Sequence, residues 1–441
     1  MAGHGAESGV PPAACVMLDA MSAAVTGPSD ADDELVQLDV TGVAHGGVFV
    51  ARHEGRVVFV SDTMPGEHVL ARVTDRGHDR FWRAETVEIL LPSADRREHF
   101  WPEAAVDRDP AARPGGAEFG HIAPRRQRDL KRDVLVDSLR RFGGIEDAET
   151  IVPAVTELPG SPDGAGWRTR VRLQVDADGL VGPYAARSHH VVEVRDIPLA
   201  VEALREAAPL GIPHPGASAI DMVASSTGQV HVTVGEGRPS SDGTLTEVVG
   251  DREFRLARHG FWQVHPAAAA TLTRAVQEAI DGQVFDPAAA NLDLYGGVGL
   301  LAAAVGDRFG PATRITSVES DGTATAFAAR NLGDWSGAAA ETARVDRYVA
   351  DLERRSGRAD RERISRSTVV LDPPRSGAGK AVMRTLGRLA PAQLVYVACD
   401  PVALARDIGF AREAGYRLTA LTAFDLFPST HHVEAVATLV R

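Results

Sequence analysis

The chain has 441 residues, of which 44% are hydrophobic and 24% charged, and these proportions are typical of a globular protein with a substantial core. The formal net charge of −13 excludes a protein that is basic over its whole surface, so any affinity for nucleic acid has to come from a local patch. No apolar run approaches the roughly 18 residues that span a bilayer, and no secretory signal is visible. Two cysteines, Cys15 and Cys399, are too few for a disulfide framework or a four-thiolate metal site. We therefore expect a cytoplasmic protein without a bound metal.

Residues 1–33 are predicted to be a disordered acidic tail. Six acidic residues and no Lys or Arg occur in the first 34 positions, with Gly, Pro, Ser and Ala between them. Met17 and Met21 are plausible alternative start sites, in which case Cys15 is not part of the working protein.

The stretch 34–96 is predicted to form a small closed β-barrel. Its Val- and Phe-rich runs are short and are separated by Gly-Gly, Glu-Gly and Pro-Gly turns. The runs are Leu35–Val40, Gly47–Val50, Val57–Val60 and His68–Val73. So many short strands within about sixty residues are most simply closed into a barrel.

The stretch 97–250 is predicted to be a mixed α+β central domain with two basic clusters. Arg125–Phe142 has the apolar spacing of a helix, and between His121 and Arg141 seven basic residues stand against three acidic ones, a local charge of +4. Trp167–Arg172 begins a predicted strand with three Arg on one face. Either cluster alone is best interpreted as a solvated charged face. Two clusters in one domain favour a surface that contacts phosphates.

The stretch 251–441 alternates strand and helix, which predicts a doubly wound α/β sheet. Strand Asn291–Tyr295 precedes a helix that ends near Phe309, and strand Ile315–Glu319 precedes a helix through Asn331. Thr368–Leu371 and Leu394–Ala398 are continuous apolar runs, as expected of strands buried on both faces. Arg417–Phe424 and His432–Val440 have no helix between them, so we expect a terminal antiparallel hairpin.

A glycine-rich loop follows the first strand of this sheet. Gly297, Gly299 and Ala302 fit the pattern G-x-G-x-x-A, and Glu319 lies about 20 residues further on, at the end of the next strand. Glycines allow the backbone to approach a ligand closely, and an acid in that place can bind ribose hydroxyls. The pattern indicates a nucleoside cofactor and suits both a nicotinamide dinucleotide and S-adenosylmethionine.

Two further loops follow the buried strands of the second half of the sheet. Asp372-Pro373-Pro374-Arg375 follows one strand, and Cys399-Asp400-Pro401 follows the next. The carboxyl ends of parallel strands are where ligands bind in an open α/β sheet. Cys399 is a candidate nucleophile, although a lone Cys is more commonly a small buried hydrophobe.

Several ordered segments resemble the motifs of the RNA uracil-5 methyltransferases. The segments are Phe261–His265, Asp293–Gly299, Asp372–Gly377, Ala398–Asp407 and Phe427–Val436. Gly42–Ala44 and Phe59–Glu67 resemble the TRAM domain, an OB-like RNA-binding barrel that many members carry at the N-terminus. The resemblance extends from about residue 35 to the end, and the motifs around Cys399 and Glu434 are its strongest parts.

The resemblance implies a Rossmann-like class I methyltransferase sheet that uses S-adenosylmethionine. By similarity, Cys399 is the nucleophile that adds to carbon 6 of uracil, and Glu434 is the base that removes the proton from carbon 5. Gln263, Tyr295, Glu319 and Asp372 match positions that hold the cofactor, together with the loop glycines Gly297 and Gly299. Asp372 could equally order its own loop or contact the uracil, and Glu434 alone could be an ordinary carboxylate at a strand end.

The chain departs from the family pattern at three places. Many relatives carry a four-cysteine iron–sulfur site after the barrel, but His99–His121 contains no cysteine, so we expect no cluster. The cysteine that often follows Asp-Leu-Tyr is Gly296, and the Asn usual after Gln-Val is His265.

Together these observations predict an enzyme that makes 5-methyluridine in structured RNA, with 23S rRNA slightly favoured over tRNA. The target base has to leave its stack, and RNA loops already present unstacked bases. We expect a monomer with no membrane contact. The alternatives are a nicotinamide-dependent dehydrogenase, which the glycine pattern alone allows, an amino-group methyltransferase, which Arg375 after Pro-Pro disfavours, and a non-catalytic RNA-binding protein on the same fold.

Overall fold

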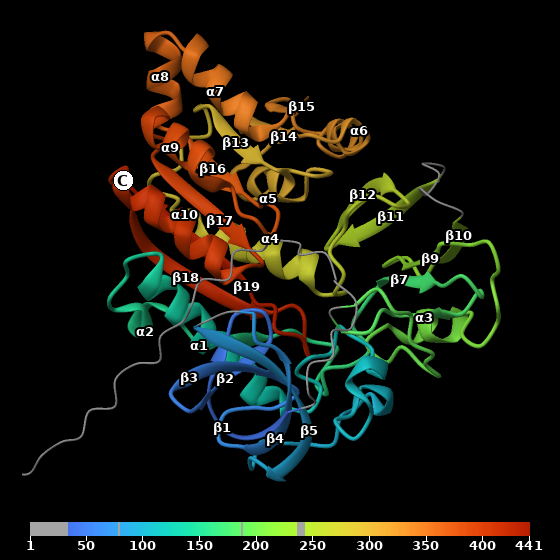
Figure 1. The fold of residues 1–441 in the computed structure, drawn as a ribbon. Coiled ribbons are helices and arrows are strands. Elements are labelled where there is room, and N and C mark those ends of the chain that lie inside the picture. Colours follow the sequence, from blue (N-terminus) through green and yellow to red (C-terminus); the bar gives the residue numbers. More distant parts are fainter. Residues whose placement is uncertain (1–33, 78–79, 187, 236–242) are drawn as a thin grey trace, which may run out of the picture. The chain divides into compact units, whose positions relative to one another are not determined.

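The computed structural model describes residues 34–441 except 78–79, 187 and 236–242. The predicted acidic tail, with Cys15, lies outside the described residues. Contacts divide the chain into two compact units, which Figure 1 shows in colours that follow the sequence. The first unit ends at Ser93. The second unit comprises Ala94–Arg441 and also the three residues His45–Gly47, which are therefore not part of the first.

The first unit is a closed five-stranded barrel, which confirms the predicted barrel. Along β1 every second side chain is buried, among them Val36, Leu38 and Val40. This period of two places one side of each strand inside the barrel. The order β1-β2-β3-β5-β4 closes because β4 pairs with β1. The strands are β1 (Leu35–Ala44), β2 (Val48–His53), β3 (Arg56–Ser61), β4 (His68–Asp75) and β5 (Phe81–Leu91).

The second unit contains the predicted doubly wound sheet, with the strand order β15-β14-β13-β16-β17-β19-β18-β6. Its first five strands in that order are parallel, and they are β15 (Ala338–Thr342), β14 (Ile315–Glu319), β13 (Asn291–Leu294), β16 (Thr368–Leu371) and β17 (Gln393–Ala398). The terminal hairpin is β18 (Arg417–Asp425) and β19 (Glu434–Val440), and β19 runs antiparallel to both of its neighbours. The fold class predicted from the sequence is confirmed.

Two apolar clusters cover the two faces of this sheet. One cluster gathers side chains from α4 (Ala268–Ala279), α5 (Leu300–Phe309) and α6 (Gly322–Asn331). The other gathers α7 (Val345–Arg355), α8 (Arg358–Ser365), α9 (Gly379–Leu389) and α10 (Pro401–Glu413). Because both faces are covered, the central strands are apolar throughout, as their sequences predict.

The segment between the barrel and the first strand of the sheet contributes a smaller sheet with the order β10-β9-β7-β8. Its strands are β7 (Arg170–Val175), β8 (Val181–Gly182), β9 (Ala219–Ala224) and β10 (Val230–Gly235), with the helix α3 (Glu202–Ala207) beside β9 and β10. Two 3-10 turns, η1 (Pro102–Ala104) and η2 (Pro110–Ala112), precede it.

Other parts of this middle segment are built into the core around the large sheet. Helix α1 (Pro124–Arg141) lies against α10 and buries Leu135 and Leu139 in that core. After α2 (Ala148–Ile151), the short strand β6 (Thr156–Glu157) pairs in parallel with β18. The hairpin of β11 (Thr244–Val249) and β12 (Arg252–Ala257) spans the predicted domain limit at residue 250, with its apolar side chains in the cluster of α4 and α5.

Candidate active site

The loop between β13 and α5 is shaped by backbone conformation and one buried carboxylate. Gly297 and Gly299 have φ of 54° and 91°, and Tyr295 has φ of 64°, which is uncommon for a residue with a side chain. Asp293 is fully buried, and its Oδ2 accepts from the Ala302 amide at 3.2 Å, in the first turn of α5. Burial raises the pKa of Asp293 to about 6. Asp293 is the first residue of the motif Asp293–Gly299, but the sequence assigned no role to its side chain.

Glu319 ends β14 beside this loop. Its Oε2 accepts from the Gly297 amide at 3.3 Å, and its Oε1 accepts from the Asp321 amide at 2.9 Å. A Cβ added at Gly297 would meet no heavy atom within 4 Å, so the loop leaves open space next to the carboxylate. The structure therefore joins Gly297 and Glu319, and the arrangement fits the ribose of a nucleoside cofactor such as S-adenosylmethionine.

Gln263 comes from a separate segment that the smaller sheet fixes in place. Thr169, just before β7, donates to the Val264 carbonyl from its amide at 2.8 Å and from its hydroxyl at 2.9 Å. Arg170 donates to the Gly260 carbonyl at 2.9 Å. In the part of the chain that the structure describes, no hydrogen bond joins the Gln263 side chain to the glycine loop.

Cys399 and Glu434 lie opposite each other on neighbouring strands. In the antiparallel register of β17 and β19, Ala398 pairs with Ala435. One step further along this register, Cys399 follows β17 and Glu434 begins β19. The two residues that the sequence placed 35 positions apart are thus adjacent at one end of the sheet.

Burial and the neighbouring charges disfavour the thiolate of Cys399. Burial raises the pKa of Cys399 to about 12, with contributions from the carboxylates of Glu434, Asp372 and Asp400, while Arg375 acts in the opposite direction. Burial also raises the pKa of Glu434 well above its ordinary value, and the charge of Asp372 adds to it. A raised thiol pKa does not by itself activate a nucleophile. The gathering of several titratable groups with shifted pKa values at one end of the sheet is nevertheless typical of functional sites.

Asp372 connects the two predicted groups of residues. Its amide donates to the Leu294 carbonyl at 3.2 Å, at the end of β13. Burial raises the pKa of Asp372, and the charge of Asp293 contributes. Asp372 in turn acts on both Cys399 and Glu434, so it lies between the glycine loop and the candidate nucleophile.

Comparison with known proteins agrees with this geometry. Residues 249–441 match the model of the tRNA (uracil-5-)-methyltransferases. An RNA methyltransferase of Streptomyces avermitilis is 37% identical, over 92% of this chain and 98% of the relative. The chain belongs to the RNA uracil-5 methyltransferase family.

Two further likenesses cover nearly the whole chain. The 23S rRNA (uracil(1939)-C(5))-methyltransferase of Alkalilimnicola ehrlichii is 29% identical, over 92% of this chain and 97% of that protein. The crystal structure of the tRNA (uracil-54, C5)-methyltransferase of Pyrococcus abyssi, in complex with S-adenosyl-L-homocysteine, superposes with a TM-score of 0.66 at 22% identity. It covers 91% of this chain and 99% of that one, and shows that the two share a fold.

The structure gives a physical reason for Gly296, where many family members carry cysteine. A Cβ at Gly296 would come within 2.0 Å of Ser317 Oγ and 2.6 Å of Asp293 Oδ2. The Ser317 hydroxyl occupies this space and donates to Asp293 Oδ2 at 3.1 Å. In this uracil-5 methyltransferase a serine on the neighbouring strand therefore requires glycine in the loop.

His265, where the family usually has Asn, supports the start of α4. Its Nδ1 accepts from the Ala267 amide at 3.1 Å, and its Nε2 lies 3.2 Å from the Ser161 hydroxyl. The ring stacks on Trp167, and burial lowers the pKa of His265 to about 4. The neutral ring thus has a structural role in the segment just before α4.

Most basic side chains of helix α1 form ion pairs or hydrogen bonds within the protein. Four of its pairs are Arg128–Glu157 at 3.0 Å, Arg140–Glu149 at 3.0 Å, Arg141–Asp137 at 2.6 Å and the buried Lys131–Asp425 at 2.5 Å. Arg132 donates to the Val152 carbonyl at 2.9 Å. For this cluster the structure favours the structural interpretation over a phosphate-contacting surface.

In the strand cluster, Arg172 pairs with Asp221 at 3.2 Å, and Arg170 lies 3.6 Å from Glu247. Arg168 differs, because its guanidinium lies over the Trp167 ring and Arg375 is near enough to lower its pKa further than burial alone. Strand β7 itself begins only at Arg170, later than predicted, so Arg168 belongs to the segment before it.

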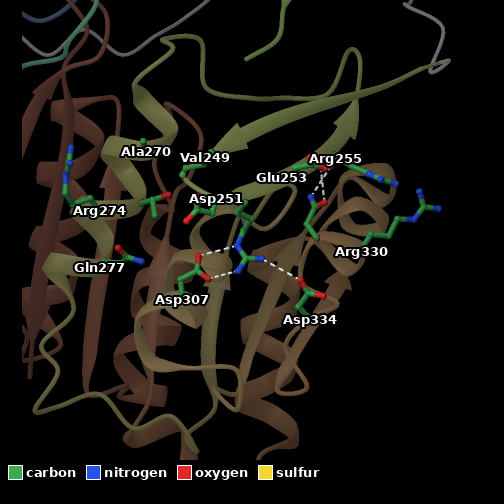
Figure 2. A pocket seen from close by; sticks show the side chains of 14 residues that line it. Val249, Asp251, Glu253, Arg255, Ala270, Arg274, Gln277, Asp307, Arg330 and Asp334 are labelled. Atoms are coloured by element: carbon green, nitrogen blue, oxygen red, sulfur yellow. Dashed lines mark hydrogen bonds and ion pairs between the residues drawn. The ribbon is translucent and has the colours of Figure 1, made fainter. Parts of the chain in front are cut away.

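A hollow of about 920 Å³ lies away from these residues, between the β11–β12 hairpin and helices α4, α5 and α6 (Figure 2). Its walls carry four Arg and four acidic side chains. Arg252 donates to Asp307 at 2.6 Å and lies 3.9 Å from Asp334. None of the predicted site residues lines it, so this hollow is separate from the candidate active site.

Over the ranges that the structure describes, no cluster of His, Cys, Asp or Glu could hold a metal ion. No helix there is both long and apolar enough to cross a membrane. The absence of an iron–sulfur cluster stays a prediction.

Proposed function

We propose that this protein transfers a methyl group from S-adenosylmethionine to carbon 5 of a uridine in structured RNA, with 23S rRNA slightly favoured over tRNA. The observation that carries the proposal is the β17–β19 register, which sets Cys399 opposite Glu434, with Asp372 acting electrostatically on both. The family relationship supports the same reaction. Because a cofactor site for S-adenosylmethionine accounts for the glycine loop, the dehydrogenase alternative is not needed to explain it.

The residue types fit the demands of this chemistry. Carbon 5 of uracil is a poor nucleophile, and addition of the Cys399 thiolate to carbon 6 makes it enolate-like. The bound cofactor would supply an electrophilic methyl group, and Glu319, Tyr295, Gln263 and the loop of Gly297 and Gly299 would hold it. Once the new carbon–carbon bond has formed, Glu434 takes the proton from carbon 5. The electron pair of the broken carbon 5–hydrogen bond then re-forms the double bond between carbons 5 and 6, and the carbon 6–sulfur bond breaks to release the Cys399 thiolate, which restores the enzyme.

Arg375 has a specific part in the first step. The pKa of Cys399 is high, and Arg375 is the cation that lowers it. The Cys399 thiol has to lose its proton to solvent before it attacks, because only the thiolate is nucleophilic. We infer that Arg375 stabilises this thiolate during the attack.

The proposal is tested by tritium release from RNA labelled at carbon 5 of uridine. Ribosomal and transfer RNA that lack 5-methyluridine are assayed separately, which also identifies the substrate class. We expect release that requires S-adenosylmethionine, is lost in Cys399→Ala and is unchanged in Cys15→Ser, the other cysteine of the chain. Cofactor binding without release on either RNA would contradict the proposal and favour the non-catalytic alternative.

Binding of the RNA offers an independent check. Binding to phosphates releases counterions from the RNA, and this release is less favourable at higher salt concentration, so log Kd should rise linearly with log salt concentration. An affinity that hardly changes with salt would contradict a phosphate-contacting surface. Sedimentation of the same protein tests the expected monomer.

A further inference from the structure

The loop after β16 makes a tight turn before α9. The Gly377 amide donates to the Pro374 carbonyl at 2.7 Å, and Gly377 and Gly379 both have φ of 80°. This loop carries Asp372 at its start and Arg375 at its centre. Strands β16 and β17 are parallel neighbours with Leu371 opposite Tyr396, so this loop begins beside the end of the strand that leads into Cys399. The charges of Asp372 and Arg375 also act on the Cys399 thiol, so the position of the loop affects the candidate nucleophile.

Two fully buried side chains fasten the far end of this loop. The Asp407 Oδ2 accepts from the Gly379 amide at 3.0 Å and from the Tyr396 hydroxyl at 2.6 Å. The Tyr396 oxygen also accepts from the Ala378 amide at 3.0 Å. Tyr396 and Asp407 therefore satisfy two successive backbone amides of the loop, and each depends on the other.

The loop also lies closely against α10. A Cβ at Gly377 would come within 2.6 Å of Asp407 Oδ2, and Arg406 donates to the Ser376 carbonyl at 2.6 Å. Helix α10 begins directly after Cys399, where the Asp400 side chain accepts from the Ala403 amide at 2.8 Å. The first turn of α10 thus follows Cys399 closely in the chain, and Asp407 in its second turn holds the loop that carries Arg375.

We propose that Tyr396 and Asp407 are positioning residues that hold the loop of Asp372 and Arg375 beside Cys399 and thereby set the reactivity of its thiol. Neither side chain is in reach of a substrate, because both are fully buried. The inference deepens the proposed function and rests on it for the role of Cys399, but its test needs no RNA.

The test compares alkylation of Cys399 by iodoacetate, which is anionic, with alkylation by neutral iodoacetamide, in full-length protein carrying Cys15→Ser. The ratio of the two rates reports the net potential at the sulfur, which Arg375 makes more positive and the neighbouring carboxyl groups make more negative, and a change in exposure cancels in it. Asp372 is held separately at the start of the loop, through its amide and the Leu294 carbonyl, so loosening the far end moves Arg375. Tyr396→Phe should lower this ratio by up to about threefold, because the upper limit is the effect of removing the Arg375 unit charge from a distance of several ångström in a solvated site.

The matched control is Tyr416→Phe. Tyr416 is also buried, and its hydroxyl donates to the Pro391 carbonyl at 2.6 Å, outside the loop. Both variants remove one buried hydroxyl and should lower thermal stability by similar amounts, but Tyr416→Phe should leave the ratio unchanged. Gly377→Ala, whose Cβ pushes against Asp407, should lower the ratio as Tyr396→Phe does.

A double-mutant cycle with Arg375→Gln decides between positioning and a general loss of structure. Arg375→Gln alone should lower the ratio, and Tyr396→Phe should lower it no further in that background. Equal ratios for Tyr396→Phe and Tyr416→Phe, or an undiminished effect in the Arg375→Gln background, would overturn the inference. If these ratios behave as expected but the wild-type protein releases no tritium, the proposed function fails and the positioning role stands.

Discussion

The two halves of the candidate site are built in different ways. Around Gly297 and Glu319 the contacts are hydrogen bonds between backbone amides and carboxylates, and space is left open by a residue without a side chain. Around Cys399 the groups are side chains that burial holds away from their ordinary pKa values, among them Glu434 and Asp372.

This difference matches what each half has to do. A cofactor site needs a fixed shape, and backbone geometry supplies most of it here. A site for covalent chemistry needs groups whose protonation can change during the reaction, and desolvation together with neighbouring charges provides this. We therefore expect substitutions in the first half to affect affinity and stability, and those in the second half to affect turnover.

The largest effect is expected for Glu434→Gln. The amide cannot take the proton from carbon 5, so turnover should fall by about 10²- to 10⁴-fold while the covalent protein–RNA adduct accumulates. Adduct is measured as a band of reduced mobility on a denaturing gel, in parallel with tritium release. Glu413→Gln, an exposed residue of α10 that pairs with Arg384, is the matched control and should be fully active. Turnover within tenfold of wild type would exclude Glu434 as the base.

The pH dependence of Cys399 tests the electrostatics of the same half. Because the pKa of Cys399 is about 12, the thiolate fraction is small at neutral pH and rises about tenfold with each pH unit. In the Cys15→Ser protein, alkylation by iodoacetamide should therefore keep accelerating from pH 7 to pH 10 without a plateau. A plateau near the pKa of a free thiol, about 8.5, would show that the site does not suppress the thiolate.

Gly296→Ala tests the shape of the cofactor half. The added Cβ would overlap Ser317 Oγ, and overpacking of this kind costs about 1–3 kcal/mol of unfolding free energy. Ser317→Ala removes the overlapping oxygen and should restore part of the loss. The control is Gly322→Ala at the first residue of α6, where the nearest atom is 3.8 Å away. Denaturant unfolding measures the stability of the wild type, Gly296→Ala, the double variant Gly296→Ala with Ser317→Ala, and Gly322→Ala. An unchanged unfolding free energy for Gly296→Ala would mean that the loop has room to move.

The smallest effect is expected for Asn331→Ala at the edge of the same half. The Asn331 side chain accepts from the Arg255 amide at 2.9 Å and donates to the Val298 carbonyl at 2.9 Å, so it ties β12 to the glycine loop. The substitution removes these hydrogen bonds and a third, to the Arg255 carbonyl, but only the bond to Val298 reaches the glycine loop. Loss of that bond, worth about 1 kcal/mol, should weaken cofactor binding roughly threefold to tenfold with kcat unchanged. Calorimetric titration with S-adenosylmethionine measures it. A fall in kcat at saturating cofactor would show that the two halves are coupled there.

The sequence by itself determined the elements and the order of the motifs. Ile315–Glu319 and Thr368–Leu371 are strands with the predicted bounds, because an apolar run bounded by turn residues is a local signal. The helix predicted over Arg125–Phe142 spans Pro124–Arg141 for the same reason. Gly297 and Glu319 could be paired in advance, since consecutive parallel strands place their carboxyl ends at one edge.

Only the tertiary structure decided which distant residues share a hydrogen bond, a space or a charge. The register that sets Cys399 opposite Glu434, the hydroxyl of Ser317 that excludes a side chain at Gly296, and the pairing of Lys131 with Asp425 each join positions far apart in the chain. A periodic pattern shows which face of an element is buried, but it does not show what lies against that face. For this reason the two basic clusters together favoured a phosphate-contacting surface in the sequence, whereas in the fold Arg128, Lys131 and Arg140 of the helix pair with acids from other elements.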